Sequence, residues 1–211
     1  MIKQVDEMLR DVRVCLDQNE VSESLLVEGD VDTLSVNDII RSKLLDAVAR
    51  VELSAPVHLL EEGHPFGENL YWCGDGRGWT LLPDDFMRLV VFEMSDWAQP
   101  VYEAIAPTDS AYALQRSPIP GLRGNVESPV CALTNRPEGK VLEFYSCDSE
   151  DATVRRAQYL PYPKIDADGG IDLSARCYTS ILYMASALTL VTFGDTDKAT
   201  LLTEQSKNAL V

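Results

Sequence analysis

Histidine is scarce in this sequence of 211 residues, since only His58 and His64 occur. Five cysteines are present, but no two of them form a C-x-x-C pair and neither histidine lies near a cysteine in the chain. That pattern argues against a zinc site or a disulfide framework, and it favours reduced, partly buried thiols. Two imidazoles also leave little capacity for general-base catalysis, so the residue inventory favours a protein that is not an enzyme.

Basic residues are outnumbered, because 18 Lys and Arg stand against 34 Asp and Glu and give a formal net charge of −16. Sequence-independent binding to the outside of a nucleic-acid duplex rests on Lys and Arg that neutralise phosphates, so the charge disfavours this function. A plain solvated surface that resists non-specific association is the favoured interpretation. An acidic wall that repels nucleic acid, and so lets it slide past, stays open as an alternative.

Membrane and secretion signals are missing as well. The first residues, MIKQVDEMLRD, carry charges every few positions and contain no apolar region of a signal peptide, so we expect a protein made in the cytoplasm. The stretch from Cys177 to Phe193 has no charged residue, but its threonines and serines make it too polar for insertion. It predicts a buried helix that ends at Gly194, and no membrane partner.

The chain is organised around residues 82–101, LPDDFMRLVVFEMSDWAQPV. A Pro-Asp-Asp turn precedes a nearly unbroken run of apolar and β-favouring residues from Phe86 to Met94. Apolar residues point alternately to both faces of this strand. The pattern therefore predicts a strand that is covered on both sides and sits centrally, with a further strand over residues 99–105.

Helical periodicity marks the beginning of the chain. Apolar residues spaced three and four apart predict an amphipathic helix over residues 2–16, packed in the core or against another subunit. Residues 17–33 are predicted to form a long loop with a short element. A second helix is expected to begin after Ser35, with Asp38 at the capping-box position, and to end at Ala55-Pro56. Its buried stripe is predicted to comprise Ile40, Leu44, Ala47, Val48 and Val51.

Apolar residues follow a strand pattern in the middle of the chain and a helical pattern towards its end. Residues 70–73 and 79–82 predict a hairpin around the string GDGRG, which lacks the G-K-[ST] ending of a phosphate-binding loop. Residues 129–134 and 140–147 predict two more strands, and residues 107–124 an exposed loop around Tyr112 and Gln115. Towards the end, Asp172 is expected to cap the helix that runs through Phe193, and a last helix covers residues 196–210.

These patterns predict an α+β fold, in which a helical bundle built from the N- and C-terminal helices carries an inserted β-rich module. The expected parts are residues 1–66 as the N-terminal helical part, residues 67–162 as the β-rich insertion, and residues 163–211 as the C-terminal helices that complete the bundle.

Acidic pairs are the remaining candidates for chemistry. Asp84 and Asp85 could act as paired carboxylates in acid–base work or metal binding, but a turn before a strand also favours Asp. The string from Asp166 to Asp172 resembles a calcium loop, yet it lacks the bidentate Glu of such loops, so a loop followed by a helix cap is favoured. The sequence therefore predicts no catalytic, cofactor-binding or metal-binding residue.

Five strings spread along the chain carry a family resemblance: VDEMLRDVRVCLDQN, SKLLDAVARVELSAPVHLL, LPDDFMRLVVFEMSDWAQPV, YALQRSPIPGLRGNVESPVCAL and LSARCYTSILYMASALTLVTFGDTDKATLLTEQSKNAL. Together with the order of the elements, they resemble the head-to-tail connector (adaptor) proteins of short-tailed, podovirus-like bacteriophages. These proteins form the ring directly beneath the portal. The resemblance spans nearly the whole chain.

The resemblance implies a virion structural protein of the neck or tail, assembled in the cytoplasm of a bacterial host. It implies a dodecameric homo-oligomeric ring that binds the phage portal protein and the next tail or ring protein, while DNA passes through without specific binding. It also implies that the end of the last helix engages the portal, through Leu201, Leu202, Leu210 and Val211.

Two other classes of function stay open beside the connector. One is a non-ring interaction protein derived from a prophage. The other is a small acidic enzyme that uses Asp84, Asp85 or His64.

Overall fold

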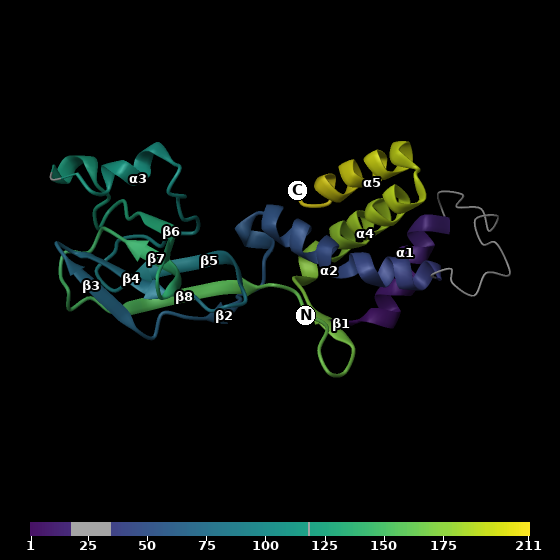
Figure 1. The fold of residues 1–211 in the computed structure, drawn as a ribbon, viewed down its shortest axis with the longest axis horizontal. Helices are drawn as coiled ribbons and strands as arrows, with labels where there is room; N and C mark the ends of the chain where they lie inside the picture. Colours follow the sequence, from purple (N-terminus) through teal and green to yellow (C-terminus); the bar gives the residue numbers. More distant parts are fainter. Residues whose placement is uncertain (18–34, 118) are drawn as a thin grey trace. The chain divides into compact units, whose positions relative to one another are not determined.

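The computed structural model describes residues 1–17, 35–117 and 119–211. The chain has helices at both ends and a β-rich part between them (Figure 1). It divides into two compact units. The helical unit comprises Met1–Glu61 together with Pro163–Val211, and the β unit comprises Glu62–Tyr162. The predicted mixture of helical ends and an inserted β-rich module is therefore found at the coarse level of the fold class.

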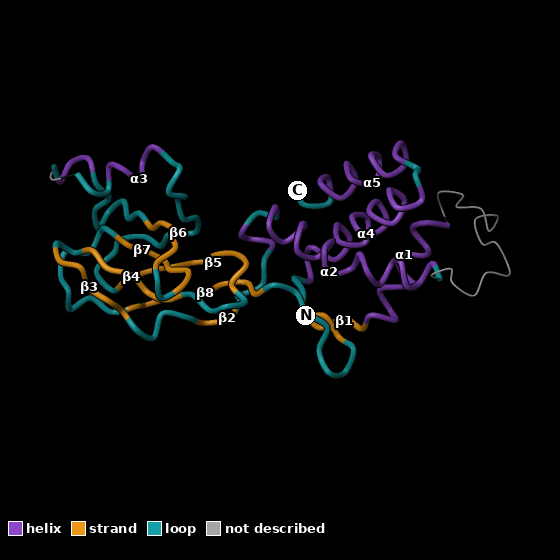
Figure 2. Tube along the Cα trace, viewed as in Figure 1, coloured by secondary structure: helices purple, strands orange, loops and turns teal. Residues whose placement is uncertain are grey.

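The helical unit contains elements from both ends of the chain, and helices dominate it (Figure 2). Its elements are β1 (Ile2–Gln4), α1 (Val5–Asp17), α2 (Val36–Ser54), η2 (Val57–Leu59), β9 (Gly170–Asp172), η4 (Ala175–Cys177), α4 (Tyr178–Phe193) and α5 (Thr196–Asn208). The long loop predicted over residues 17–33 lies, beyond Asp17, outside the described residues.

Helix α2 confirms its predicted signals. The Ser35 side chain accepts a hydrogen bond from the backbone N–H of Asp38, and the Asp38 carboxylate accepts one from the backbone N–H of Ser35. This reciprocal pair satisfies two donors that the first turn of a helix leaves without a partner. Ala55 adopts an extended backbone before Pro56 and ends the helix. The residues of the predicted stripe are fully buried: Ile40, Leu44, Ala47, Val48 and Val51.

Two predictions at the edges of the helical unit are wrong. The first helix begins at Val5 rather than Ile2, because Ile2–Gln4 forms β1, which pairs antiparallel with β9. Asp172 is not a helix cap, since it is the last residue of β9 and lies opposite Ile2. Both errors have the same cause: a strand of three residues is too short to leave a period in the sequence.

Helix α4 lies at the centre of the helical core, since it contacts α1, α2 and α5. This agrees with the prediction of a helix buried on most sides. Its buried polar side chains are tolerated there because they are hydrogen-bonded; for example, the Thr189 hydroxyl donates to the Ala185 carbonyl at 2.8 Å. Gly194 ends the helix in a left-handed conformation with φ of 84°. None of the helices in the described ranges is long and apolar enough to cross a membrane.

The β unit contains two antiparallel sheets (Figure 2). The three-stranded sheet has the order β2 (His64–Pro65), β8 (Val154–Pro161), β5 (Phe86–Met94). The four-stranded sheet has the order β3 (Leu70–Gly74), β4 (Arg77–Leu81), β7 (Gly139–Phe144), β6 (Cys131–Arg136). Phe92 of β5 contacts Phe144 of β7 with ring centroids 5.8 Å apart, so the two sheets share one aromatic core.

Strand β5 confirms one prediction and contradicts another. Its residues are buried on both faces, as the apolar run from Phe86 to Met94 predicts. However, β5 is not the central strand, because it pairs with β8 on one side and makes only an isolated bridge, between Phe92 and Val101, on the other. The centre of that sheet is β8. Arg155 and Arg156 lie near its start, so the apolar pattern of a long strand is not visible in the sequence.

The segment between β5 and β6 also differs from expectation. Residues 99–105 form no strand and contribute only isolated bridges at Val101 and Ile105. The predicted exposed loop at 107–124 contains the short helices α3 (Ser110–Leu114) and η3 (Pro120–Leu122). Gln115 is buried and ties this segment together, since its side chain donates to the Ala111 carbonyl and accepts from the Gly124 N–H. This buried amide therefore helps to order a segment that was predicted as an exposed loop.

Candidate functional site

The four residues predicted at the portal contact lie in two environments. Leu201 on α5 is 62% exposed and Val211 is fully exposed at the end of the chain. Leu202 and Leu210 are buried and belong to the core of the helical unit. Of these four residues, Leu201 and Val211 present apolar surface to a partner, so they are the members of the predicted set that are suitable for an interface.

Asp84 and Asp85 do not form a carboxylate pair directed into a pocket. Asp85 accepts a hydrogen bond from the hydroxyl of Tyr159 at 2.8 Å, and its backbone carbonyl accepts from the N–H of Tyr162. Asp84 is exposed in the turn before β5. The contacts of Asp85 therefore join the start of β5 to the end of β8, which is the structural role expected of Asp in a turn.

The string that resembles a calcium loop forms a turn. One carboxylate oxygen of Asp166 accepts from the N–H groups of Asp168 and Gly170, at 2.9 and 2.6 Å. Asp166 thus satisfies backbone donors of its own loop in the manner of an Asx turn. Within the described residues, no group of three or more His, Cys, Asp or Glu is placed to hold a metal ion.

All five cysteines are free thiols. Burial raises the pKa of the Cys131 thiol well above its ordinary value, and it is the main cause that raises the pKa of Cys147 to about 12. Both thiols therefore stay protonated at neutral pH and are poor nucleophiles. Cys73 is the exposed member of the five, and it lines a cavity on the four-stranded sheet.

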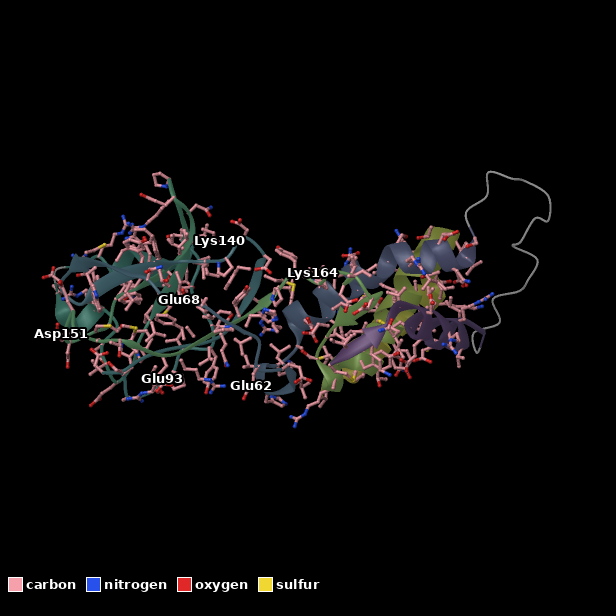
Figure 3. All side chains as sticks on the ribbon, turned by 90° about the horizontal axis from the view of Figure 1, so that it is seen from below. Glu62, Glu68, Glu93, Lys140, Asp151 and Lys164 are labelled. Atoms are coloured by element: carbon pink, nitrogen blue, oxygen red, sulfur yellow. The ribbon has the colours of Figure 1, made fainter. Side chains whose placement is uncertain are left out.

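A cavity of about 250 Å³ opens on one face of the four-stranded sheet. We call it the arginine pocket, because three of the 18 basic residues of the chain meet there. Its lining residues are Cys73, Arg77, Gly78, Arg116, Arg136, Glu143 and Tyr145. By contrast, acidic side chains such as Glu62, Glu68, Glu93 and Asp151 are spread over separate parts of the β unit (Figure 3).

Strand register explains why these residues meet. Glu143 on β7 pairs with Trp79 on β4 and with Ala132 on β6. Alternate residues of a strand share a face, so Arg77 lies on the face of Trp79, and Arg136 lies on the face of Ala132. Tyr145 follows Glu143 by two residues and shares its face. The sheet thus gathers side chains that are far apart in sequence.

Glu143 is the buried anchor of the pocket. One of its carboxylate oxygens accepts from Nε and Nη2 of Arg136, at 3.1 and 2.7 Å. The other accepts from the hydroxyls of Tyr112, at 3.2 Å, and Tyr145. Burial alone would raise the pKa of Glu143, but the hydrogen bonds from Tyr145 and Arg136, with the Arg136 charge, outweigh it and hold the pKa below its ordinary value.

Aromatic rings hold two of the three arginines, Arg116 and Arg136, in place. The guanidinium of Arg136 lies 4.9 Å from the ring centroid of Trp79, which itself stacks on Tyr71 at 4.2 Å. Arg116 lies 5.2 Å from the centroid of Tyr112 and donates to its hydroxyl at 2.9 Å. Cation–π contacts of this kind hold a guanidinium in one place while leaving other N–H groups able to donate.

The arginine pocket could not be predicted from the sequence. The hairpin turn around Asp75 and Gly76 was predicted, and Tyr112 was expected in an exposed loop. Nothing in the sequence connected these residues with Glu143, because the connection depends on the register of four strands. Comparison of this chain with protein-family models and with curated proteins finds no match.

Proposed function

We propose that this protein is a virion structural protein of a short-tailed bacteriophage, which forms a ring below the portal and joins the capsid to the tail. The observation that carries the proposal is the architecture, in which one continuous β unit is inserted into a helical unit built from both ends of the chain. That arrangement is the one that the family resemblance implies, and nothing in the geometry of Asp84 and Asp85 supports catalysis.

Charge and exposed apolar residues support the same function. A net charge of −16 suits a ring whose lumen repels phosphate, so that DNA passes without sticking. The helical unit also exposes apolar side chains, among them Val14 at 55%, Val191 at 55% and Leu201 at 62%. Such residues are suited to contacts between subunits and with the portal.

The proposal is tested by measuring assembly. Light scattering after size-exclusion chromatography should give a mass many times that of the 23.4 kDa chain, and negative-stain images should show rings that dock on purified portal rings. In a mobility-shift assay at low salt, these rings should not retain duplex DNA. A strictly monomeric protein that never docks on a portal would refute the proposal.

A variant pair tests the portal contact within this function. Leu201→Glu places a charge on an exposed apolar residue of α5 and should abolish docking while rings still form. Leu53→Glu, at a side chain of similar exposure (48%) on α2, is the matched control and should dock normally. Leu202 and Leu210 are unsuitable for this test, because a charge there would disrupt the core of the helical unit.

A further inference from the structure

We infer that the arginine pocket binds a single carboxylate group that is presented by an acidic peptide segment. The inference goes beyond ring assembly and does not depend on it, since every residue that carries it lies within the β unit. The ligand is an Asp or Glu side chain of a protein chain.

Charge balance in the pocket selects a monoanion. Three guanidinium groups, from Arg77, Arg116 and Arg136, stand against two carboxylates, Glu143 and Asp75, which pair with Arg136 and Arg77. One positive charge is left over in a protein whose net charge is −16. A carboxylate neutralises that charge. A phosphate dianion would bring a second negative charge close to Glu143, where the buried surroundings make repulsion costly.

Arg116 is the group whose charge is left over. Glu143 already accepts hydrogen bonds from Arg136, Tyr112 and Tyr145, so its lone pairs are occupied. Among residues 1–17, 35–117 and 119–211, Arg116 forms no ion pair, and the side-chain acceptor it contacts is the neutral hydroxyl of Tyr112. An ionised acceptor makes a stronger hydrogen bond with a guanidinium than a phenol does. An incoming carboxylate therefore gains most at Arg116.

The pocket is organised before the ligand arrives. Arg136 is held by two hydrogen bonds to Glu143 and by the ring of Trp79, and Arg116 is held by Tyr112. Binding therefore does not have to order long side chains, which is a main cost of binding at an arginine. A volume of about 250 Å³ accommodates one side chain and lies below the usual range for drug-sized ligands.

Two sources offer the same carboxylate. A second copy of this chain carries 34 acidic residues, and a different acidic protein would present the same group. Both sources present the same chemical group to the pocket. One arm of the experiment therefore tests whether the pocket binds a carboxylate, and the other identifies which protein supplies it.

The first arm measures binding of a capped glutamate, N-acetyl-glutamate N-methylamide, by the thermal shift of the purified protein. Capped glutamine at equal ionic strength is the neutral control, and inorganic phosphate is the dianion control. Capped glutamate should raise the melting temperature in a saturable manner, whereas the two controls should not. Equal shifts with all three, or no shift with capped glutamate, would overturn the inference.

Variants place the binding at the pocket. Arg116→Gln should weaken the binding of capped glutamate by about tenfold, the effect of one charge-assisted hydrogen bond, and Arg77→Gln is a second variant in case the first does not fold. Arg155→Gln is the matched control, because Arg155 pairs with Glu93 elsewhere in the β unit and its side chain is 55% exposed. Unchanged binding in well-folded Arg116→Gln and Arg77→Gln would overturn the assignment to this pocket.

The second arm identifies the source by light scattering. If a second copy supplies the carboxylate, Arg116→Gln and an excess of capped glutamate should each reduce self-association. If another protein supplies it, both should leave self-association unchanged while capped-glutamate binding is still lost in the variant. A monomer that binds capped glutamate would refute the proposed ring and support the pocket, so the two proposals fail separately.

Discussion

Gly76 lies in the turn between β3 and β4. Its φ is 64°, and a Cβ atom built there would lie 1.8 Å from the carbonyl oxygen of Cys147. Gly74 also has a positive φ, of 89°, but a Cβ there meets nothing within 4 Å. Substitutions at these two positions therefore distinguish the free-energy cost of a left-handed backbone from the cost of a clash with a neighbouring chain segment.

We predict that Gly76→Ala destabilises the protein by more than about 3 kcal/mol, because it adds that clash to a backbone strain of about 1–2 kcal/mol. It also disrupts the hydrogen bond from the Cys147 N–H to the Gly76 carbonyl. Gly74→Ala should cost the strain alone. Urea denaturation followed by tryptophan fluorescence measures both. Equal losses in the two variants would contradict the role of the contact with Cys147.

Glu143 and Glu52 are buried carboxyl groups with opposite pKa shifts. Hydrogen bonds hold the pKa of Glu143 below its ordinary value, although burial opposes them, whereas burial raises the pKa of Glu52, which accepts the backbone N–H of Ser174 at 2.7 Å. A lowered pKa means that the ionised group favours the folded state. That contribution is present above the ordinary value of 4.5 and is lost as the pH falls through the lowered pKa. For Glu52 the ionised form disfavours the folded state, and this cost is relieved as the pH falls through the raised pKa.

We predict from these signs that the two Gln variants diverge with pH. Glu143→Gln should be less stable than the parent protein at pH 7, by about 1–3 kcal/mol, and the difference should shrink below pH 4.5. The free energy of unfolding of Glu52→Gln, relative to that of the parent protein, should be highest at pH 7 and should decrease as the pH falls towards 4.5. Urea denaturation across this pH range measures both. Parallel pH profiles for the two variants would contradict the prediction.

A residue's role could be predicted from the sequence when it depends on residues nearby in the chain. Ser35, Asp38 and Gly194 act on backbone groups within a few positions of themselves, so their roles follow from the sequence alone. Glu143 and Arg116 act through partners that the fold brings together, and a single sequence carries no record of such partners.

Helices α4 and α5 are joined by a buried pair of serines. The Ser180 hydroxyl lies 2.9 Å from the Ser206 hydroxyl, and each hydroxyl lies 2.8 Å from the backbone carbonyl of the other residue. Both side chains are almost fully buried. The small residues allow the two helices to approach closely, while the hydrogen bonds satisfy groups that water does not reach.

We predict that the effects of Ser180→Ala and Ser206→Ala are not additive. Each single change removes one hydrogen bond to a backbone carbonyl and the contact between the two hydroxyls, and should cost about 1–3 kcal/mol. Because both single changes remove the same hydroxyl contact, the double change should cost less than the sum by about 1 kcal/mol. A double-mutant cycle from chemical denaturation gives this coupling. The pair Ser180→Ala with Ser42→Ala, an exposed serine on α2, is the control and should be additive.

At the scale of elements, length and period set what was predictable. Helix α2 is long, strongly capped and apolar on one stripe, so its start, end and buried face were all predicted. Strand β5 was predicted as a strand, but its place in the sheet was not, because burial on both faces does not reveal how many hydrogen-bonded neighbours a strand has. The two four-residue segments of the hairpin left a recognisable pattern in the sequence, whereas β1 and β9 are too short to leave one.

The β unit is continuous in sequence and has its own hydrophobic core. We therefore predict that residues 62–162 fold as an isolated fragment, with a single cooperative unfolding transition and dispersed NMR resonances. Residues 1–61 serve as the comparison and should not fold alone, because α4 and α5, which complete their core, come from the other end of the chain. A fragment 62–162 without a cooperative transition would contradict this independence.

At the scale of the molecule, the broad α+β class followed from the change of period along the chain. The predicted boundary between residues 66 and 67 stays a prediction, while the compact β unit begins at Glu62, before the glycines and proline that suggested a linker. Gly63 shows why: a Cβ atom there would lie 2.5 Å from the carbonyl oxygen of Tyr159, so this residue already packs against β8. Composition marks flexible-looking residues, but packing decides to which unit they belong.

The insertion also sets an order in time. During synthesis, every strand of the β unit emerges from the ribosome before α4 (Tyr178–Phe193) does, so the inserted unit can begin to fold while the helical unit still lacks about half of its core. Of the helices in the described residues that contact α2, α1 is made before it and α4 after it, so until α4 emerges a chaperone or a premature contact with another nascent chain can compete for the apolar stripe of α2. Completion of the helical unit therefore waits for the last residues of the chain.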